Sequence, residues 1–146
     1  MSPWRRPPSL EALAAMASGT MVEHLDIRFT GVGPDSITAT MPADERTFTP
    51  FRQLHGGASV VLAETLGSVA ANFCVDEGHY AVGVEINANH VRAVSGGRVT
   101  GVVTPVHVGR RTQVWETRIS DPHGRLACVS RLTIAVVPRP AAEPAE

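Results

Sequence analysis

The chain has 146 residues, of which 43% are hydrophobic and 18% are charged, and its formal net charge is -1. This length suits one globular domain, and the near-neutral charge gives no reason to expect nucleic acid or an anionic membrane as a partner. No apolar run approaches the roughly 18 residues of a membrane span, so we expect a cytoplasmic protein without membrane insertion. The two cysteines, Cys74 and Cys128, lack any metal-ligand spacing; we expect both to be reduced core residues and predict no metal site.

The first third of the chain predicts one short helix and two strands. Ser9 is a suitable N-cap for a helix over 10–16, which Gly19 ends. Apolar residues then alternate with polar ones over 25–29 and again over 37–41, and the turn signal GVGPD separates the two predicted strands. No helix follows GVG, so we interpret it as a turn rather than a phosphate-binding loop. Residues 44–54 show no clear period and predict a loop.

The segment QLHGGASVVLAETLGSVAA, residues 53–71, predicts a helix from Gly57 to about Phe73. It is apolar on most faces, as is typical of a helix buried on nearly all sides. The exceptions are spaced i, i+1, i+4 and i+8, which places them on one narrow stripe. These polar residues are Glu64, Thr65, Ser68 and Asn72.

The remainder predicts strands in two successive strand–turn–strand units. The first is 82–89, 95–97 and 98–107, and the second is 113–120, 121–124 and 126–137. One long buried helix with a mostly antiparallel sheet predicts an α+β fold in which the sheet curls around the helix. We expect a single domain over 1–137 and, because of its Pro/Ala/Glu composition, a disordered tail over 138–146.

The HGG stretch and Glu64 together predict chemistry on an acyl group. Gly56 and Gly57 lack a Cβ and lie at a helix start, where unpaired N–H groups and the macrodipole stabilise negative charge. Backbone donors aimed at a developing oxyanion accelerate acyl transfer, and His55 can donate to the same oxygen. Glu64 lies among apolar residues, where a carboxylate is costly to ionise and becomes a better base or nucleophile.

The spacing of these groups predicts at least a dimer. Gly56 and Glu64 are about 12 Å apart along one helix, too far to contact one reacting carbon from the same chain. If both act, each comes from a different subunit.

The residues alone leave a second interpretation open. HGG can be only a turn and a helix start, and Glu64 can belong to a solvated stripe, because motif matches of this length arise by chance. His90 and His107 are more often ordinary strand residues. Likewise, arginines such as Arg92, Arg110 and Arg111 are more often surface charges than phosphate ligands.

Three separated motifs resemble one family. LHGGASVVLAE, GVEINANHVR, and HVGRR with QVWE occur in the order seen in the hotdog-fold acyl-CoA thioesterases, and the resemblance covers residues 4–137. It is greatest to the branch that contains 1,4-dihydroxy-2-naphthoyl-CoA hydrolase of menaquinone synthesis; the proofreading thioesterase of the enterobactin pathway and the Arthrobacter-type 4-hydroxybenzoyl-CoA thioesterase are related. The resemblance implies hydrolysis of an acyl-CoA, with an aromatic acyl group favoured and no metal or redox cofactor. It also implies homodimers paired into homotetramers, with sites at subunit interfaces.

The resemblance also implies residue roles. Glu64 matches the catalytic carboxylate, which acts as nucleophile or as general base on water. Gly56 matches the glycine whose N–H polarises the thioester carbonyl, with His55 beside it, and Ser68 matches a serine that positions the acyl group or the attacking water. The positions that match coenzyme A-binding regions are Gly83, His90, Val91, Arg92, His107, Val108, Gly109, Arg110, Arg111 and Thr112.

One position departs from the family pattern. Close relatives carry a glutamine six residues before the HGG histidine, where this chain has Thr49. Threonine can donate one hydrogen bond but has a shorter reach, so we expect an effect on acyl specificity and rate rather than on the reaction type. Gln53 lies only two residues before His55, and we expect that it does not substitute.

Two alternatives differ in function. A hotdog hydratase or dehydratase uses a histidine with a differently placed acidic residue, which the spacing from HGG to Glu64 fits poorly. A non-catalytic acyl-CoA sensor on the same fold usually carries a DNA-binding extension, and this sequence predicts neither a helix-turn-helix at its N-terminus nor a basic excess.

Overall fold

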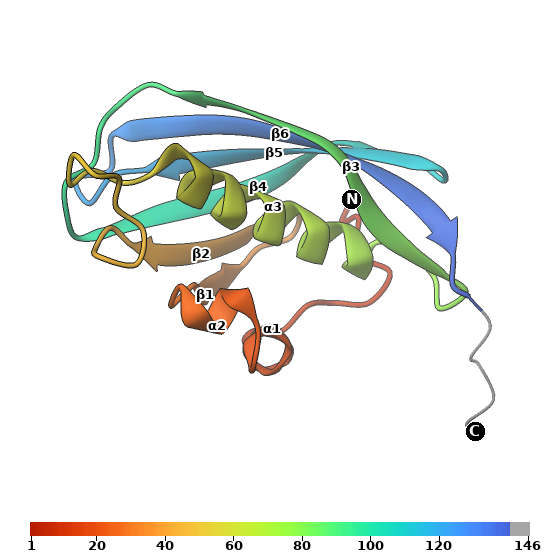
Figure 1. Cartoon of the computed structure of the whole chain (residues 1–146). Coiled ribbons are helices and arrows are strands. Elements are labelled where there is room, and N and C mark those ends of the chain that lie inside the picture. The colour runs from red at the N-terminus through yellow and green to blue at the C-terminus, as the bar shows by residue number, and fades with distance from the viewer. Residues whose placement is uncertain (141–146) are drawn as a thin grey trace.

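A six-stranded antiparallel sheet curls around one long helix, α3 (Gly56–Phe73), in the computed structural model, which describes residues 1–140 (Figure 1). The strand order is β1-β2-β4-β5-β6-β3. This arrangement confirms the predicted α+β hotdog fold. The strands are β1 (Arg28–Val32), β2 (Ile37–Pro42), β3 (His79–His90), β4 (Arg98–Val108), β5 (Thr112–Ser120) and β6 (Leu126–Pro138).

The core forms where α3 lies in the concave face of the sheet. Leu62 and Leu66 are fully buried, and burying a leucine side chain stabilises the fold by about 1.5–3 kcal/mol. The helix can approach the sheet closely because each contributes a glycine to the contact between them. A Cβ at Gly101 of the sheet would lie 2.8 Å from Leu66 Cδ1, and one at Gly67 of the helix would lie 2.6 Å from Leu132 Cδ2. The predicted burial is confirmed for the face of α3 that contacts the sheet; the remaining residues of the helix are half-buried, apart from the exposed Gly57.

The N-terminal segment closes the end of the core at which α3 finishes. The rings of Trp4 and Trp115 stack with centroids 6.0 Å apart, and the Trp4 indole N–H donates to the Gly33 carbonyl at 3.2 Å. The predicted first helix is present as α1 (Leu10–Ala17), and the Ser9 hydroxyl accepts from the Ala12 N–H as its N-cap.

The strand predicted over 25–29 is partly wrong. The chain forms a short helix, α2 (Met21–His24), and only then enters β1 at Arg28. The Thr20 hydroxyl caps α2, and Asp26 takes a positive φ of 52° that turns the chain out of the helix. Local capping and a turn residue therefore override the alternating pattern.

The prediction that the strands over 82–89 and 98–107 lie side by side is also wrong. Both strands exist, but β3 pairs with β6, whereas β4 pairs with β2 and β5. The segment 91–97 thus crosses from one edge of the sheet toward the other. Periodicity reports which residues form a strand, not which strand lies beside it.

The C-terminal end of the described chain is held by a backbone hydrogen bond to the segment before β3. Pro138 ends β6 and the Arg139 N–H donates to the Gly78 carbonyl at 2.9 Å; the part of the predicted tail at 141–146 lies outside the described residues. Among residues 1–140, no helix has the length and apolar character needed to cross a membrane.

Candidate active site

The start of α3 is fixed by His55, which is its N-cap. The His55 Nδ1 accepts the Gly57 N–H at 2.8 Å, and the His55 N–H donates to the Thr47 carbonyl at 2.7 Å. Since Nδ1 accepts, the proton of the neutral ring is on Nε2. His55 therefore caps the helix with one ring nitrogen and offers the other as a donor.

Gly56 supplies the free backbone donor of the site. Its N–H has no acceptor within residues 1–140, whereas the Gly57 N–H is used by the cap. Of the two glycine N–H groups at the helix start, only that of Gly56 is free. A Cβ at Gly56 would lie 2.9 Å from the Nε2 of His90, so a larger residue here would require the His90 ring to move.

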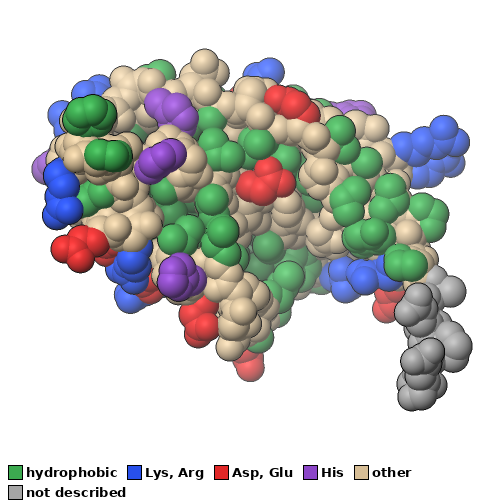
Figure 2. All heavy atoms as spheres, in the orientation of Figure 1, with side chains coloured by type: hydrophobic (Ala, Val, Ile, Leu, Met, Phe, Trp, Pro, Cys, Tyr) green, Lys and Arg blue, Asp and Glu red, His purple; other side chains and the backbone are tan. Residues whose placement is uncertain are grey.

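A cavity of about 440 Å³ opens beside this donor. Its wall includes Gly56, the buried Ser59, and the predicted binding residues His90, Val91 and Arg92. Figure 2 shows histidine side chains gathered at the end of the molecule where α3 begins. The structure therefore brings one predicted coenzyme A-binding segment together with the predicted oxyanion donor.

Glu64 lies two turns further along α3, against β3. The Ser68 hydroxyl is 3.5 Å from its Oε1, and a Cβ at Gly83 would overlap the same oxygen. A β-bulge interrupts β3 between Gly83 and Glu85 at this point. The half-buried carboxylate forms no ion pair with any residue of the described range 1–140. Gly83, predicted to bind coenzyme A, contacts this carboxylate.

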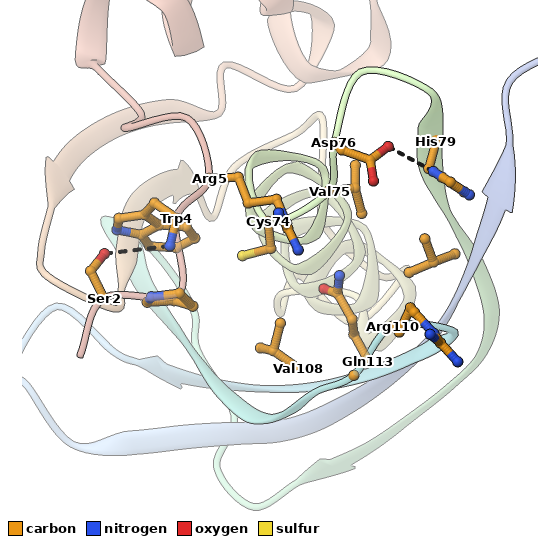
Figure 3. A pocket seen from close by; sticks show the side chains of 13 residues that line it. Ser2, Trp4, Arg5, Cys74, Val75, Asp76, His79, Val108, Arg110 and Gln113 are labelled. Atoms are coloured by element: carbon orange, nitrogen blue, oxygen red, sulfur yellow. Dashed lines mark hydrogen bonds and ion pairs between the residues drawn. The ribbon is translucent and has the colours of Figure 1, made fainter.

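The second predicted coenzyme A-binding segment, 107–112, lies at the opposite end of the helix. Val108, Gly109 and Arg110 line another cavity, of about 510 Å³, beside Cys74 at the end of α3 (Figure 3). The buried Gln113 side chain points into this cavity. Roughly 27 Å of helix separates the two cavities, so one chain does not bring the two segments together.

Thr49 has its hydroxyl in a turn rather than in the cavity. It accepts the Phe51 N–H at 3.2 Å. Gln53, by contrast, lines the cavity beside Gly56. Because Gln53 lies only two residues before His55, we expected that it does not substitute for the family glutamine. No signal in the sequence shows how the loop folds back on itself.

The residues with shifted pKa values lie outside this site. Hydrogen bonds from Arg28 and Arg98 lower the pKa of Asp26, and burial raises the pKa of Cys74 to about 12. Within residues 1–140, no group of three or more His, Cys, Asp or Glu side chains is arranged to hold a metal ion.

Sequences of known proteins are similar to this chain over most of its length. The sequence pattern described as "Thioesterase superfamily" matches residues 52–128. The 1,4-dihydroxy-2-naphthoyl-CoA hydrolase of Escherichia coli is 57% identical over 134 residues, which are 92% of this chain and 98% of that protein. The proofreading thioesterase EntH of Cronobacter sakazakii is 54% identical, with the same coverage of 92% and 98%.

Solved structures agree with the sequence comparison. A mutant thioesterase from Pseudomonas aeruginosa superimposes with a TM-score of 0.92 at 51% identity, covering 94% of this chain and 100% of that one. A thioesterase from Haemophilus influenzae superimposes with a TM-score of 0.91 at 46% identity, covering 97% and 99%.

Proposed function

This chain belongs to the thioesterase superfamily and is an acyl-CoA thioester hydrolase, and we propose that its substrate carries an aromatic acyl group. The first candidate is 1,4-dihydroxy-2-naphthoyl-CoA, an intermediate of menaquinone synthesis, because a relative named for that activity is 57% identical over nearly its whole length. The relatives also favour hydrolysis over the hydratase and sensor alternatives. We further propose a cytoplasmic reaction without a metal or redox cofactor.

The observation that carries the mechanism is the position of two reactive groups on one helix. Gly56 offers a free N–H at the start of α3, and Glu64 lies about 12 Å further along it. One thioester cannot contact both groups of the same chain. We therefore place each site between two subunits, with Gly56 from one and Glu64 from the other.

Strand β3 provides the surface for such a dimer. It is 12 residues long and forms an edge of the sheet, and Val84 on it is 65% exposed. A long free edge with exposed apolar residues pairs readily with another strand. Strand β3 and helix α3 run in opposite directions (Figure 1), so antiparallel pairing of two β3 strands makes the two α3 helices antiparallel. We propose the register that lays the start of one α3 beside the middle of the other. Two such dimers then form the proposed homotetramer.

The chemistry follows from these positions. The Gly56 N–H, and the Nε2–H of His55, donate to the thioester oxygen and stabilise the negative charge that develops on it. Glu64 either attacks the carbonyl carbon or removes a proton from a water that attacks. The C–S bond then breaks, the coenzyme A thiolate leaves and takes up a proton, and water supplies the oxygen of the free acid. Ser68 positions the carboxylate or the water.

The direct test replaces Glu64. We expect Glu64→Ala to lower kcat/KM on a panel of acyl-CoA thioesters by at least about a hundredfold, with circular dichroism and Tm showing that the protein stays folded. Aromatic acyl groups should give the highest kcat/KM in the wild-type chain. Activity near the wild-type level in Glu64→Ala would remove this carboxylate from the mechanism.

Mixing inactive subunits tests whether the site is shared. Gly56→Ala and Glu64→Ala chains, unfolded together and refolded, form heterodimers in which one of the two sites has both intact groups. We expect recovery of about a quarter of the wild-type activity. The matched control is the double variant Gly56→Ala/Glu64→Ala mixed with wild type: its heterodimers have no intact shared site, so only the wild-type homodimers are active and about a quarter of the activity remains, against about half if each site lay within one chain. If mixing restores nothing, each site is built within one chain.

A further inference from the structure

The loop before α3 brings Gln53 to the position opposite Thr49. An isolated β-bridge joins Phe48 to Leu54, and the Thr49 N–H donates to the Gln53 carbonyl at 2.7 Å. Arg52, with a φ of 62°, takes the left-handed conformation that lets the loop close. Two residues four apart in sequence therefore lie side by side at the base of one turn.

The two side chains of this pair have different surroundings. The Thr49 hydroxyl accepts the Phe51 N–H and so stabilises the turn. Gln53 is an exposed residue that lines the cavity with Gly56 and His90, and its side-chain amide makes no hydrogen bond to any residue between 1 and 140. Gln53 is thus the amide side chain that can reach a ligand at the free Gly56 donor.

Ser59 indicates that this cavity accepts polar ligand atoms. Its residue surface is only 4% exposed, it lines the same cavity one turn after Gly56, and its hydroxyl has no hydrogen-bond partner among the described residues. No buried side-chain oxygen or nitrogen of residues 1–140 is left without a partner, so the Ser59 oxygen is reached from the cavity and can hydrogen-bond a ligand beside Gly56.

We propose that Gln53 is a further catalytic residue, whose side-chain NH2 donates to the thioester oxygen beside the Gly56 N–H. This role rests on the proposed thioesterase mechanism and deepens it. As the carbonyl carbon becomes tetrahedral, its oxygen gains negative charge, and a second fixed donor lowers the barrier. The proposal departs from the expectation from sequence, in which Gln53 does not substitute for the family glutamine, because Gln53 lines the cavity and Thr49 does not.

The test compares two replacements of Gln53 with a control in the same loop. We expect Gln53→Ala to lower kcat at least about tenfold with a smaller change in KM. Gln53→Glu keeps the size of the side chain but replaces the donor with a carboxylate that repels the oxyanion, so it should lose more activity than Gln53→Ala. The control is Glu45→Ala, in which an exposed side chain of the loop 44–54 is removed; it should retain wild-type kcat.

The outcomes separate this role from the general mechanism. Gln53→Ala within twofold of wild type, or Gln53→Glu more active than Gln53→Ala, overturns the role of Gln53, while loss of activity in Glu64→Ala leaves the thioesterase mechanism intact. A wild-type chain that hydrolyses no member of the thioester panel overturns both. Tm values for each variant show whether a loss of activity reflects folding.

Discussion

At its C-terminal end α3 has its last carbonyl groups hydrogen-bonded by the N-terminal segment, whereas at its N-terminal end one amide donor has no partner within residues 1–140. The Phe73 carbonyl accepts the N–H groups of Arg5 and Arg6 at 2.9 and 3.2 Å, and the Asn72 carbonyl accepts the Arg6 guanidinium at 2.9 Å. The Gly56 N–H at the other end faces a cavity.

The difference teaches how one helix serves two purposes. Every helix leaves unpaired groups at both ends. Here, the chain's own residues satisfy one end, which stabilises the fold, and the other end holds the donor that we propose for the ligand. We therefore expect changes at the C-terminal end to alter stability, and changes at the N-terminal end to alter turnover.

The largest expected effect concerns Cys74, the C-cap of α3. Burial raises the pKa of its thiol from 9.0 to about 12, so at pH 8 the native chain holds about a thousandfold less reactive thiolate than the unfolded chain. Labelling with iodoacetamide, followed by mass spectrometry, should be slower in the native chain than in urea by at least this factor. Equal labelling rates would show that this end of the helix is open.

The same shift predicts a loss of stability in alkali. Between pH 9.0 and about 12 the unfolded thiol loses its proton and the native thiol keeps it. The unfolded state then binds fewer protons, so the free energy of unfolding falls as the pH rises above 9.0 and is unaffected below it. Urea unfolding of the wild type and Cys74→Ala over this range isolates the contribution of Cys74 from that of Cys128, whose pKa burial also raises.

Gly56→Ala tests the open end and should have the next largest effect. The new methyl group would displace the His90 ring, which lies 2.9 Å from the Cβ position, and would disturb the backbone donor. Loss of one oxyanion donor lowers kcat by about a hundredfold or more, while Tm should change little. A large fall in Tm with normal kcat in the remaining folded protein would reverse the assignment of this end.

Arg6→Ala tests the closed end and should have the smallest effect. The variant loses the hydrogen bond to the Asn72 carbonyl and the contact of the guanidinium with the Phe73 ring, whose centroid is 5.9 Å from Cζ. We expect the free energy of unfolding to fall by about 1–2 kcal/mol, measured in urea, with kcat unchanged. A change in kcat at constant stability would mean that the two ends are coupled.

Sequence could predict those parts of the molecule that depend on local patterns. The helix over 56–73 and strands β2, β4, β5 and β6 follow from periodicity, and Ser9 caps α1 as expected. The pairing of β3 with β6 could not be predicted in this way, because it depends on contacts between residues more than 35 positions apart.

The site shows the same division. HGG and Glu64 could be proposed from residue type and spacing, since both are positioned by one helix. The use of the Gly57 N–H by the His55 ring, and the place of Gln53 opposite Thr49, depend on side-chain and loop conformations that a one-dimensional spacing does not contain.

The stacking of Trp4 on Trp115 has a practical consequence. The chain contains two tryptophans, and they form this one pair, with their rings inclined by 7°. Intrinsic fluorescence and near-ultraviolet circular dichroism therefore report whether the N-terminal segment that contains Trp4 is packed against Trp115. This contact is distant from the first residues of α3. A spectroscopic signal that needs no label is thus available to follow unfolding separately from catalysis.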